Sequence, residues 1–441
     1  MKYNWQRAFL ILLLIEFFVF RSNIFGMGLY LDDWLDVYAV SKTGSLWGTV
    51  RALAGMGLHL KRPLTILLLA PIHHLIDPLK FTGLWMPQLI FGALETSAAF
   101  LLFLLMSRLL QNIRLAFAIA VFALLYPNRA ATHFWISMIG QPFAHILVLA
   151  SLLFHLNWTE HEKNRDLLIG QLLYGAALLF YESVMLAPLL LGGALAGLWS
   201  KQGKKWPEIA GKLTRSFWPY AVSLGLVLTW QWVGYNLFVE AASHQSQLLA
   251  PSAATALKNL LAGFGCTMPW PVSLCVIRFF DALREFSGWS WLALLLGAAL
   301  ISRKLSFLDG GTGESPALDR VLGGAILGAF IGSYLPYLLS DAYMPYVNGI
   351  MSRVNSTSAW PGGMILAGAL LLLSRFCSKY RVPRQLPRAF LGLIVAAFIW
   401  TNWLEASAWR NAWRLQSDIL QRLGSNVKDL PDHPLVVLTG V

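Results

Sequence analysis

The sequence has few cysteines, few charged residues and no nucleotide-binding motif. Three Cys in 441 residues exclude a disulfide framework and a Cys-rich zinc site. Only 13% of the residues are charged, whereas a soluble domain has roughly 25%. The Gly-rich stretch 310–313 lacks a Lys-Ser or Lys-Thr ending, so it is not a phosphate-binding loop. These absences argue against a soluble nucleotide-binding protein.

What the sequence has in abundance is apolar and aromatic residues. Hydrophobic residues make up 57% of the chain and the mean hydropathy is +0.58. Nineteen Trp suit the aromatic belts at the two surfaces of a bilayer. The net charge of +12 does not indicate nucleic acid, because Lys and Arg lie in short segments between apolar runs, as in cytoplasmic loops. The composition therefore predicts an integral membrane protein.

The apolar runs predict an all-α, polytopic bundle of about eleven transmembrane helices. About 20 apolar residues span a bilayer. The expected spans lie near 7–25, 85–106, 115–126, 136–156, a pair within 167–199, 217–238, 288–302, 321–340, 359–375 and 388–404. This arrangement leaves roughly 19 of the 34 Lys and Arg in the short segments expected in the cytoplasm. We therefore predict a plasma-membrane protein with a cytoplasmic N-terminus and an external C-terminus.

Two apolar regions do not read as full spans. Residues 26–84 form a first external loop, in which 62–76 is too short to cross and is expected at the interface or re-entering. Prolines break 257–280, which is also predicted to be interfacial or re-entrant. The predicted domains are then a transmembrane domain, 1–404, and a short external tail, 405–441, whose first part is expected to form an amphipathic helix.

Three carboxylates open the first external loop, at Asp32, Asp33 and Asp36. A carboxylate near a membrane surface can act as a general base on a hydroxyl, or hold a metal near a phosphate. The alternative is that they cap a helix or lie in a solvated loop, since Asp is favoured at helix N-termini. The spacing alone does not decide between these alternatives.

Several short motifs resemble the GT-C superfamily of membrane glycosyltransferases. They are the acidic pair, Arg-Pro-Leu at 62–64, Tyr-Glu-Ser at 181–183 before an apolar run with Pro188, SRVNSTSAWPGG at 352–363, and NAWRLQSDILQRL with HPLVVL near the end. The resemblance covers most of the chain as a layout. It implies a GT-C-like bundle with interfacial helices in the first external loop.

The resemblance also implies a reaction. A sugar would move with inversion from a polyprenyl-phosphate-linked donor to a glycan, lipid or protein acceptor on the external, periplasmic face of the membrane. One acidic residue of the first external loop would be the catalytic base, which here is Asp32 or Asp33, with Asp32 favoured. The Asp pair permits a divalent metal, Mg²⁺ or Mn²⁺, without requiring one.

A lipid-linked phosphate needs cationic partners, and Arg suits bidentate phosphate contacts better than Lys. The candidates are Arg62, Arg129, with His133 one turn away, and Arg353, although arginines at span ends also anchor helices at the interface. Glu182 is expected at an outer turn, where a near-membrane carboxylate needs a partner such as one of these arginines.

Other readings remain open. A transporter or flippase of a lipid-linked or anionic substrate would carry charges along a path through the membrane and inverted repeats, but no repeat is evident. A non-enzymatic assembly protein with the same architecture is a third reading. Glu95 and His145 are expected to face the interior of the bundle, where either could hydrogen-bond a neighbouring helix.

Overall fold

The computed structural model describes residues 5–21, 24–30, 32–41, 43–55, 62–76, 84–238, 253–305, 316–338, 344–347, 350–381, 383 and 385–426. This part of the chain is helical and contains no strand. The α-helices are α1 (Trp5–Phe20), α2 (Asp32–Val40), α3 (Leu46–Gly55), α4 (Thr65–Leu75), α5 (Trp85–Leu110), α6 (Ile113–Leu125), α7 (Ala130–Phe134), α8 (Gly140–His161), α9 (Asn164–Phe180), α10 (Pro188–Lys201), α11 (Trp206–Phe238), α12 (Ala253–Thr267), α13 (Pro269–Glu285), α14 (Gly288–Lys304), α15 (Pro316–Tyr334), α16 (Ala359–Lys379) and α17 (Gln385–Asn426). Short 3₁₀ helices include η1 (Ile24–Gly26), η3 (Ile136–Met138), η4 (Glu182–Val184), η7 (Leu335–Tyr337) and η8 (Ile350–Asn355).

Among these residues six helices are long and apolar enough to cross a membrane, or seven if α12 and α13, bent by 52° at their junction, count as one span. The multi-pass prediction is confirmed to that extent. A bundle of about eleven spans is not confirmed, because five of the predicted spans are not among these helices. Four of them, α1, α6, α9 and α14, have only 16, 13, 17 and 17 residues, and the fifth, α11, is long but is not among the helices that are apolar enough. The bend at α12 and α13 suits either a broken span or the predicted re-entrant segment.

The shortest of the predicted spans, α6, is the centre of the bundle. Every side chain from Leu115 to Leu125 is buried, and α6 packs against α5 and α16. Asn112 caps the helix by accepting a hydrogen bond from the Leu115 amide at 3.1 Å. The helix ends before Pro127, as predicted. A helix that is apolar on all sides is most stable when its whole surface is buried, and other helices surround α6 in this way.

Glycines bring α10 and α15 into direct backbone contact. Gly193 on α10 faces Gly324 on α15, while Gly197, one turn later on α10, faces the main chain of Arg320, and Gly328, one turn later on α15, faces that of Leu189. A Cβ added at Gly193 would lie 2.0 Å from the Gly324 carbonyl oxygen. Such small-residue spacing lets membrane helices pack closely without side chains between them. Although α9 and α10 adjoin in sequence, α9 packs mainly on α8, whereas α10 packs mainly on α15.

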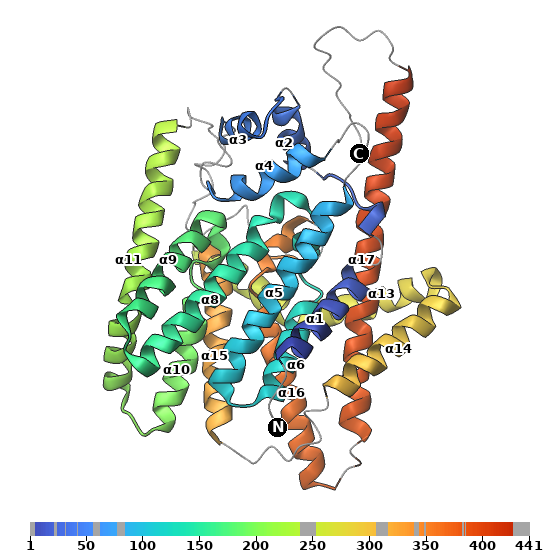
Figure 1. Cartoon of the computed structure of the whole chain (residues 1–441). Helices are drawn as coiled ribbons and strands as arrows, with labels where there is room; N and C mark the ends of the chain where they lie inside the picture. The colour runs from blue at the N-terminus through green and yellow to red at the C-terminus, as the bar shows by residue number, and fades with distance from the viewer. Residues whose placement is uncertain are drawn as a thin grey trace.

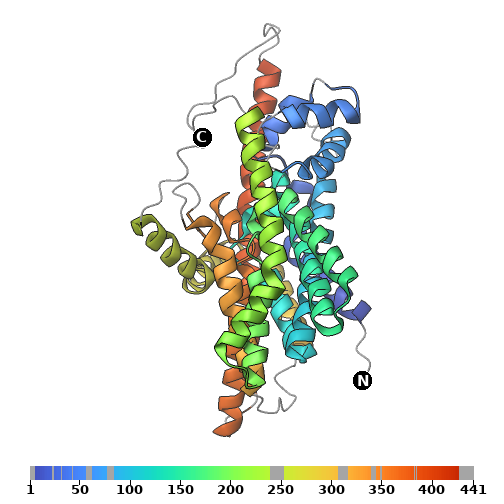
Figure 2. The same ribbon diagram turned by 90° about the vertical axis from the view of Figure 1, so that its left-hand side faces the viewer.

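The first loop folds into α2, α3 and α4, grouped at one end of the bundle, while α1 begins toward the other end (Figure 1). None of these three helices is long enough to span a membrane, which agrees with the predicted absence of a crossing there. In Figure 2 the long helices run side by side, and α12 and α13 lie to one side of them. The predicted tail begins within α17, which continues as one helix to Asn426.

Candidate functional site

The acidic segment is fastened to the bundle by Asp33. Its carboxylate is fully buried. Oδ1 accepts hydrogen bonds from the amide of Ser137 at 2.8 Å and from its hydroxyl at 2.6 Å. Oδ2 accepts from the amide of Tyr30 at 2.9 Å, as an acidic residue does when it reaches back over the first turn of a helix. Asp33 therefore joins α2 to η3 in the bundle.

The environment of Asp33 favours its neutral form. Burial raises the pKa of Asp33 to about 7, although the hydrogen bonds from Ser137 and Tyr30 and the nearby His73 oppose that rise. The desolvation of a carboxylate is costly, which is why burial dominates. The main chain of Asp32 begins α2, but its side chain lies outside the described residues. The preference for Asp32 as the base thus stays a prediction.

The third carboxylate of the segment, Asp36, pairs with a histidine of α4. Oδ2 of Asp36 lies 3.4 Å from Nε2 of His73, and both side chains are buried. Trp34 extends the anchorage of α2 in another direction, since its indole nitrogen donates to the Gln416 side chain of α17 at 3.2 Å. The part of α17 that extends beyond the predicted last span therefore helps to hold α2 in position.

Arg62 and Glu182 form a bidentate ion pair beside α4. The Nε of Arg62 donates to Oε2 of Glu182 at 2.7 Å, and its Nη2 donates to Oε1. The guanidinium also lies 3.8 Å from the centre of the Tyr181 ring. The side chains of Arg62 and Glu182 remain 22% and 32% exposed, so the pair lies at a surface. The prediction that Glu182 has an arginine partner is confirmed.

The segment 135–138 connects these groups. Its Ser137 binds Asp33, and the guanidinium carbon of Arg353 lies 5.3 Å from the centre of the Trp135 ring. The hydroxyl of Tyr181 lies 3.4 Å from the sulfur of Met138. One short irregular segment thus binds Asp33 of α2, packs its Trp135 ring against Arg353, and contacts Tyr181, the ring against which Arg62 lies.

Buried polar side chains hold the irregular segments together behind this site. The amide nitrogen of Gln141 donates to the Arg353 carbonyl oxygen at 3.1 Å and to the Ser356 hydroxyl. Asn128 donates to the Ser358 hydroxyl at 2.9 Å, and Asn355 donates back to the Asn128 carbonyl oxygen at the same distance. These bonds satisfy backbone and side-chain groups that have left regular helices inside an apolar bundle.

The structure separates Arg129 and His133 from the surface site. Both side chains are buried. Arg129 forms an ion pair with Glu95 at 2.9 Å and donates to the Ala123 carbonyl oxygen at 3.2 Å. His133 stacks on Phe20 with ring centres 3.9 Å apart, and burial with two nearby arginines lowers its pKa. Their positions do not suit contact with a substrate phosphate at the surface.

A second buried ion pair lies beside that of Arg129 and Glu95. Arg21 and Glu16 approach to 3.0 Å with both side chains inaccessible to solvent. Arg21 also donates to the Gln88 side chain at 2.5 Å and to the His133 carbonyl oxygen at 2.8 Å. Glu95 and Arg129 both act electrostatically on Glu16, so the two pairs form one cluster of four ionisable side chains. As predicted, Glu95 faces the bundle interior, and so does His145.

Sequence reasoning missed the neutral polar partners, chiefly Ser137, Trp135 and Gln141. A Gln at the start of a long apolar run is a signal of an interior polar contact, whereas nothing in the sequence marks Ser137 as the partner of Asp33. As for a metal, the described residues bring no three His, Cys, Asp or Glu side chains together. Mg²⁺ or Mn²⁺ at the Asp pair stays a prediction.

Comparison of the chain with models of known protein families, with curated proteins and with solved structures gave no match.

Proposed function

We propose that the protein is a membrane glycosyltransferase that moves a sugar from a polyprenyl-phosphate-linked donor to an acceptor at the end of the bundle that carries α2–α4. The observation that supports it is the grouping of three ionisable side chains around residues 135–138. Asp33 binds Ser137 directly, Arg353 lies over Trp135, and Arg62 lies over Tyr181, which contacts Met138.

A carboxylate and two cations suit such a transfer. The base takes the proton of an acceptor hydroxyl, the acceptor oxygen attacks the anomeric carbon from the side opposite the phosphate, and the bond from that carbon to the phosphate oxygen breaks. The main demands are an activated hydroxyl and stabilisation of the negative charge on the departing phosphate. In this proposal Arg62 and Arg353 bind the phosphate, because both are partly exposed and each is positioned by an aromatic ring.

The two aspartates take different roles. Asp33 is buried and its oxygens accept three hydrogen bonds, so it acts as a positioning residue that fastens α2. Asp32 is the proposed base. The external face, the periplasmic location and the cytoplasmic N-terminus follow from the distribution of Lys and Arg in the sequence and belong to the proposal.

The test is transfer from a polyprenyl-phosphate sugar by Asp32→Asn and Asp33→Asn, each purified in detergent. Asp32→Asn should lower kcat by about 10²- to 10⁴-fold, the usual contribution of a general base. Asp33→Asn should lower kcat less than Asp32→Asn does, and its activity should recover under conditions that stabilise α2. Asp166→Asn, at the start of α9, is the matched control and should retain full activity. Full activity in both α2 variants would refute the proposal.

The arginines are tested separately by the dependence on the donor. Arg353→Gln should raise KM for the donor or lower kcat/KM by about tenfold or more, since charge-assisted hydrogen bonds to phosphate contribute about 1.5–3 kcal/mol. Arg165→Gln, an exposed arginine at the start of α9, is the control. An unchanged kcat/KM in Arg353→Gln and Arg62→Gln alike would remove the arginines from the site.

The buried cluster of Glu16, Arg21, Glu95 and Arg129 favours a second candidate function. Ionisable residues inside a membrane bundle are costly and often mark a transport path. This supports a transporter or flippase of a lipid-linked or anionic substrate as the alternative. Reconstituted vesicles distinguish the two functions, because a flippase moves its substrate across the bilayer without changing its covalent structure.

A further inference from the structure

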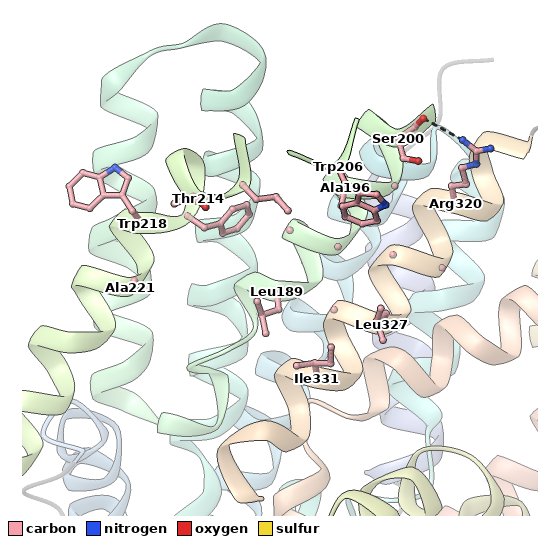
Figure 3. Close-up of a pocket in the computed structure, with 18 residues that line it drawn as sticks. Leu189, Ala196, Ser200, Trp206, Thr214, Trp218, Ala221, Arg320, Leu327 and Ile331 are labelled. Carbon is pink, nitrogen blue, oxygen red and sulfur yellow. Dashed lines mark hydrogen bonds between the residues drawn. The ribbon is translucent and has the colours of Figure 1, made fainter. Parts of the chain in front are cut away.

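An apolar groove of about 800 Å³ runs along the surface between α10, α11 and α15. Leu189, Leu213, Phe217, Trp218, Leu327 and Ile331 are among the side chains that line it. Figure 3 shows Leu189, Trp218, Leu327 and Ile331 along the three helices, with Ser200 and Arg320 together at one end of the groove. The lining is almost wholly apolar, so it offers a surface for a hydrocarbon chain.

The groove exists because glycines on α10 and α15 leave the surface without side chains. Gly192 and Gly323 line it: a Cβ at Gly192 would only touch Phe217 and Leu213 at 3.7–3.9 Å, and a Cβ at Gly323 would meet no atom within 4 Å. Both α10 and α15 belong to helices long and apolar enough to cross a membrane. In a bilayer the medium that fills such a hollow is lipid, because water has no polar partners there.

One end of the groove is strongly basic. The segment 201–215 holds five Lys or Arg and one Glu. The ammonium groups of Lys204 and Lys212 lie 5.8 and 5.7 Å from the centre of one ring, that of Trp199. Arg320 lines the groove and donates to the Ser200 carbonyl oxygen at 3.3 Å, and within the described part of the chain it forms no ion pair.

Among the residues that the structure describes, the acidic groups near this end do not neutralise it. Glu208 lies 3.7 Å from Lys204, and Asp319 is bound to Arg375 at 2.9 Å. The guanidinium of Arg320 in the lining, and two ammonium groups on Trp199, the residue before Ser200 of the lining, therefore leave an excess of positive charge within this described part of the chain. Basic pockets between membrane helices attract anionic headgroups, and the excess charge complements one here.

We propose that this groove binds a phospholipid with a net negative headgroup, one acyl chain lying along α10, α11 and α15 and the phosphate among Arg320, Lys204 and Lys212. Charge complementarity selects this occupant over a zwitterionic lipid. The basic end, at the turn between α10 and α11, lies at the opposite end of the bundle from α2–α4 (Figure 1). The site is therefore separate from that of the proposed transfer and does not rest on it.

The test is native mass spectrometry of the full chain released from nanodiscs that hold equal amounts of phosphatidylglycerol and phosphatidylcholine with identical acyl chains. The wild-type protein should retain phosphatidylglycerol at least about fivefold more than phosphatidylcholine. The triple variant Arg320→Gln, Lys204→Gln, Lys212→Gln should lose that preference. Arg165→Gln, which removes one exposed charge from the start of α9, should keep it.

A variant that fills the groove tests the acyl chain. Gly323→Leu places a side chain in the open groove and should reduce retention of both lipids by about fivefold. Gly175→Leu is the matched control, because a Cβ at Gly175 on α9 also meets no atom within 4 Å and that residue does not line the groove. Helix content measured by circular dichroism confirms that each variant is folded.

Three outcomes would overturn the proposal: equal retention of the two lipids by the wild-type protein, an unchanged preference in the triple variant, or unchanged retention in Gly323→Leu. A dimer mass that Gly323→Leu abolishes would show instead that a second copy of the chain fills the groove.

Discussion

The hydrogen bond between the hydroxyl of Ser137 and the carboxylate of Asp33 should control how firmly α2 is held. Its length is 2.6 Å, and the two residues are 104 positions apart in the chain. Above about pH 8 the carboxylate is ionised, because its pKa is about 7. A hydrogen bond to an ionised group contributes about 1.5–3 kcal/mol. Ser137→Ala removes this hydrogen bond and leaves the one that the backbone amide of residue 137 donates to Asp33.

Amide hydrogen exchange of α2 measures the effect, since it reports the free energy of local opening. With about 1.4 kcal/mol for each factor of ten, exchange of α2 in Ser137→Ala at pH 8.5 should be about 10- to 100-fold faster than in the wild type. Exchange of the central helix α6 should not change. In an Asp33→Asn background the same substitution should matter less, about 2- to 10-fold, because the bond is then between neutral groups.

The control for this experiment is Ser97→Ala on α5. Its hydroxyl donates to the Ala93 carbonyl oxygen within the same helix at 2.8 Å, and its side chain is exposed. This control should leave exchange of α2 unchanged. If α2 in Ser137→Ala exchanges within about twofold of the wild type, the hydrogen bond from the Ser137 hydroxyl to Asp33 does not hold α2, and the reasoning from its length and charge is refuted.

Three further outcomes are expected. Burial raises the pKa of Asp33 to about 7 from its ordinary 3.8, so the folded protein binds this proton more tightly than the unfolded chain; the protection of α2 should be greatest below about pH 4 and fall as the pH rises through 7, by at most about 4 kcal/mol, and Asp33→Asn should flatten this profile. Gly324→Ala should destabilise the bundle by about 1–3 kcal/mol in thermal unfolding followed by tryptophan fluorescence, because its Cβ would lie 2.1 Å from a carbonyl oxygen of α10, while Gly323→Ala should have little effect; equal midpoints would contradict the close crossing. Glu95→Gln should cost about 3–5 kcal/mol by leaving a buried arginine unpaired, and Glu160→Gln, in an exposed pair, about 1 kcal/mol or less; the reverse order would show that the buried pair contributes nothing.

The sequence predicted the helical class, the absence of a crossing in the first loop and the early end of α6 at Pro127. These features depend on local properties: the length of apolar runs, the mean hydropathy and the backbone restriction that proline imposes. The predicted number of about eleven spans is not confirmed, because α1 and α6 are too short to cross alone and are held in place by the helices around them. Length and hydropathy do not report such packing.

The candidate site divides in the same way. An acidic pair in the first loop and an arginine partner for Glu182 were readable from residue types, since buried or near-membrane charges need partners. The burial of Arg129 and His133 could not be predicted from residue types, because a turn after a short span can face either water or the bundle interior. The partner of Arg129 also lies 34 residues earlier in the chain, on α5. Only the packing of α5 against α6 and α7 brings that pair together.

By itself the sequence determined that this chain is a multi-helix membrane protein with an acidic segment after its first apolar helix. The tertiary structure alone decided what that segment touches. Ser137, Trp135 and Met138 are unremarkable in the sequence, yet they connect Asp33, Arg353 and Tyr181 across gaps of 104, 218 and 43 residues. The physical reason is that hydrogen bonds and aromatic contacts act over a few ångströms, and only the packing of the helices sets which residues come within that reach.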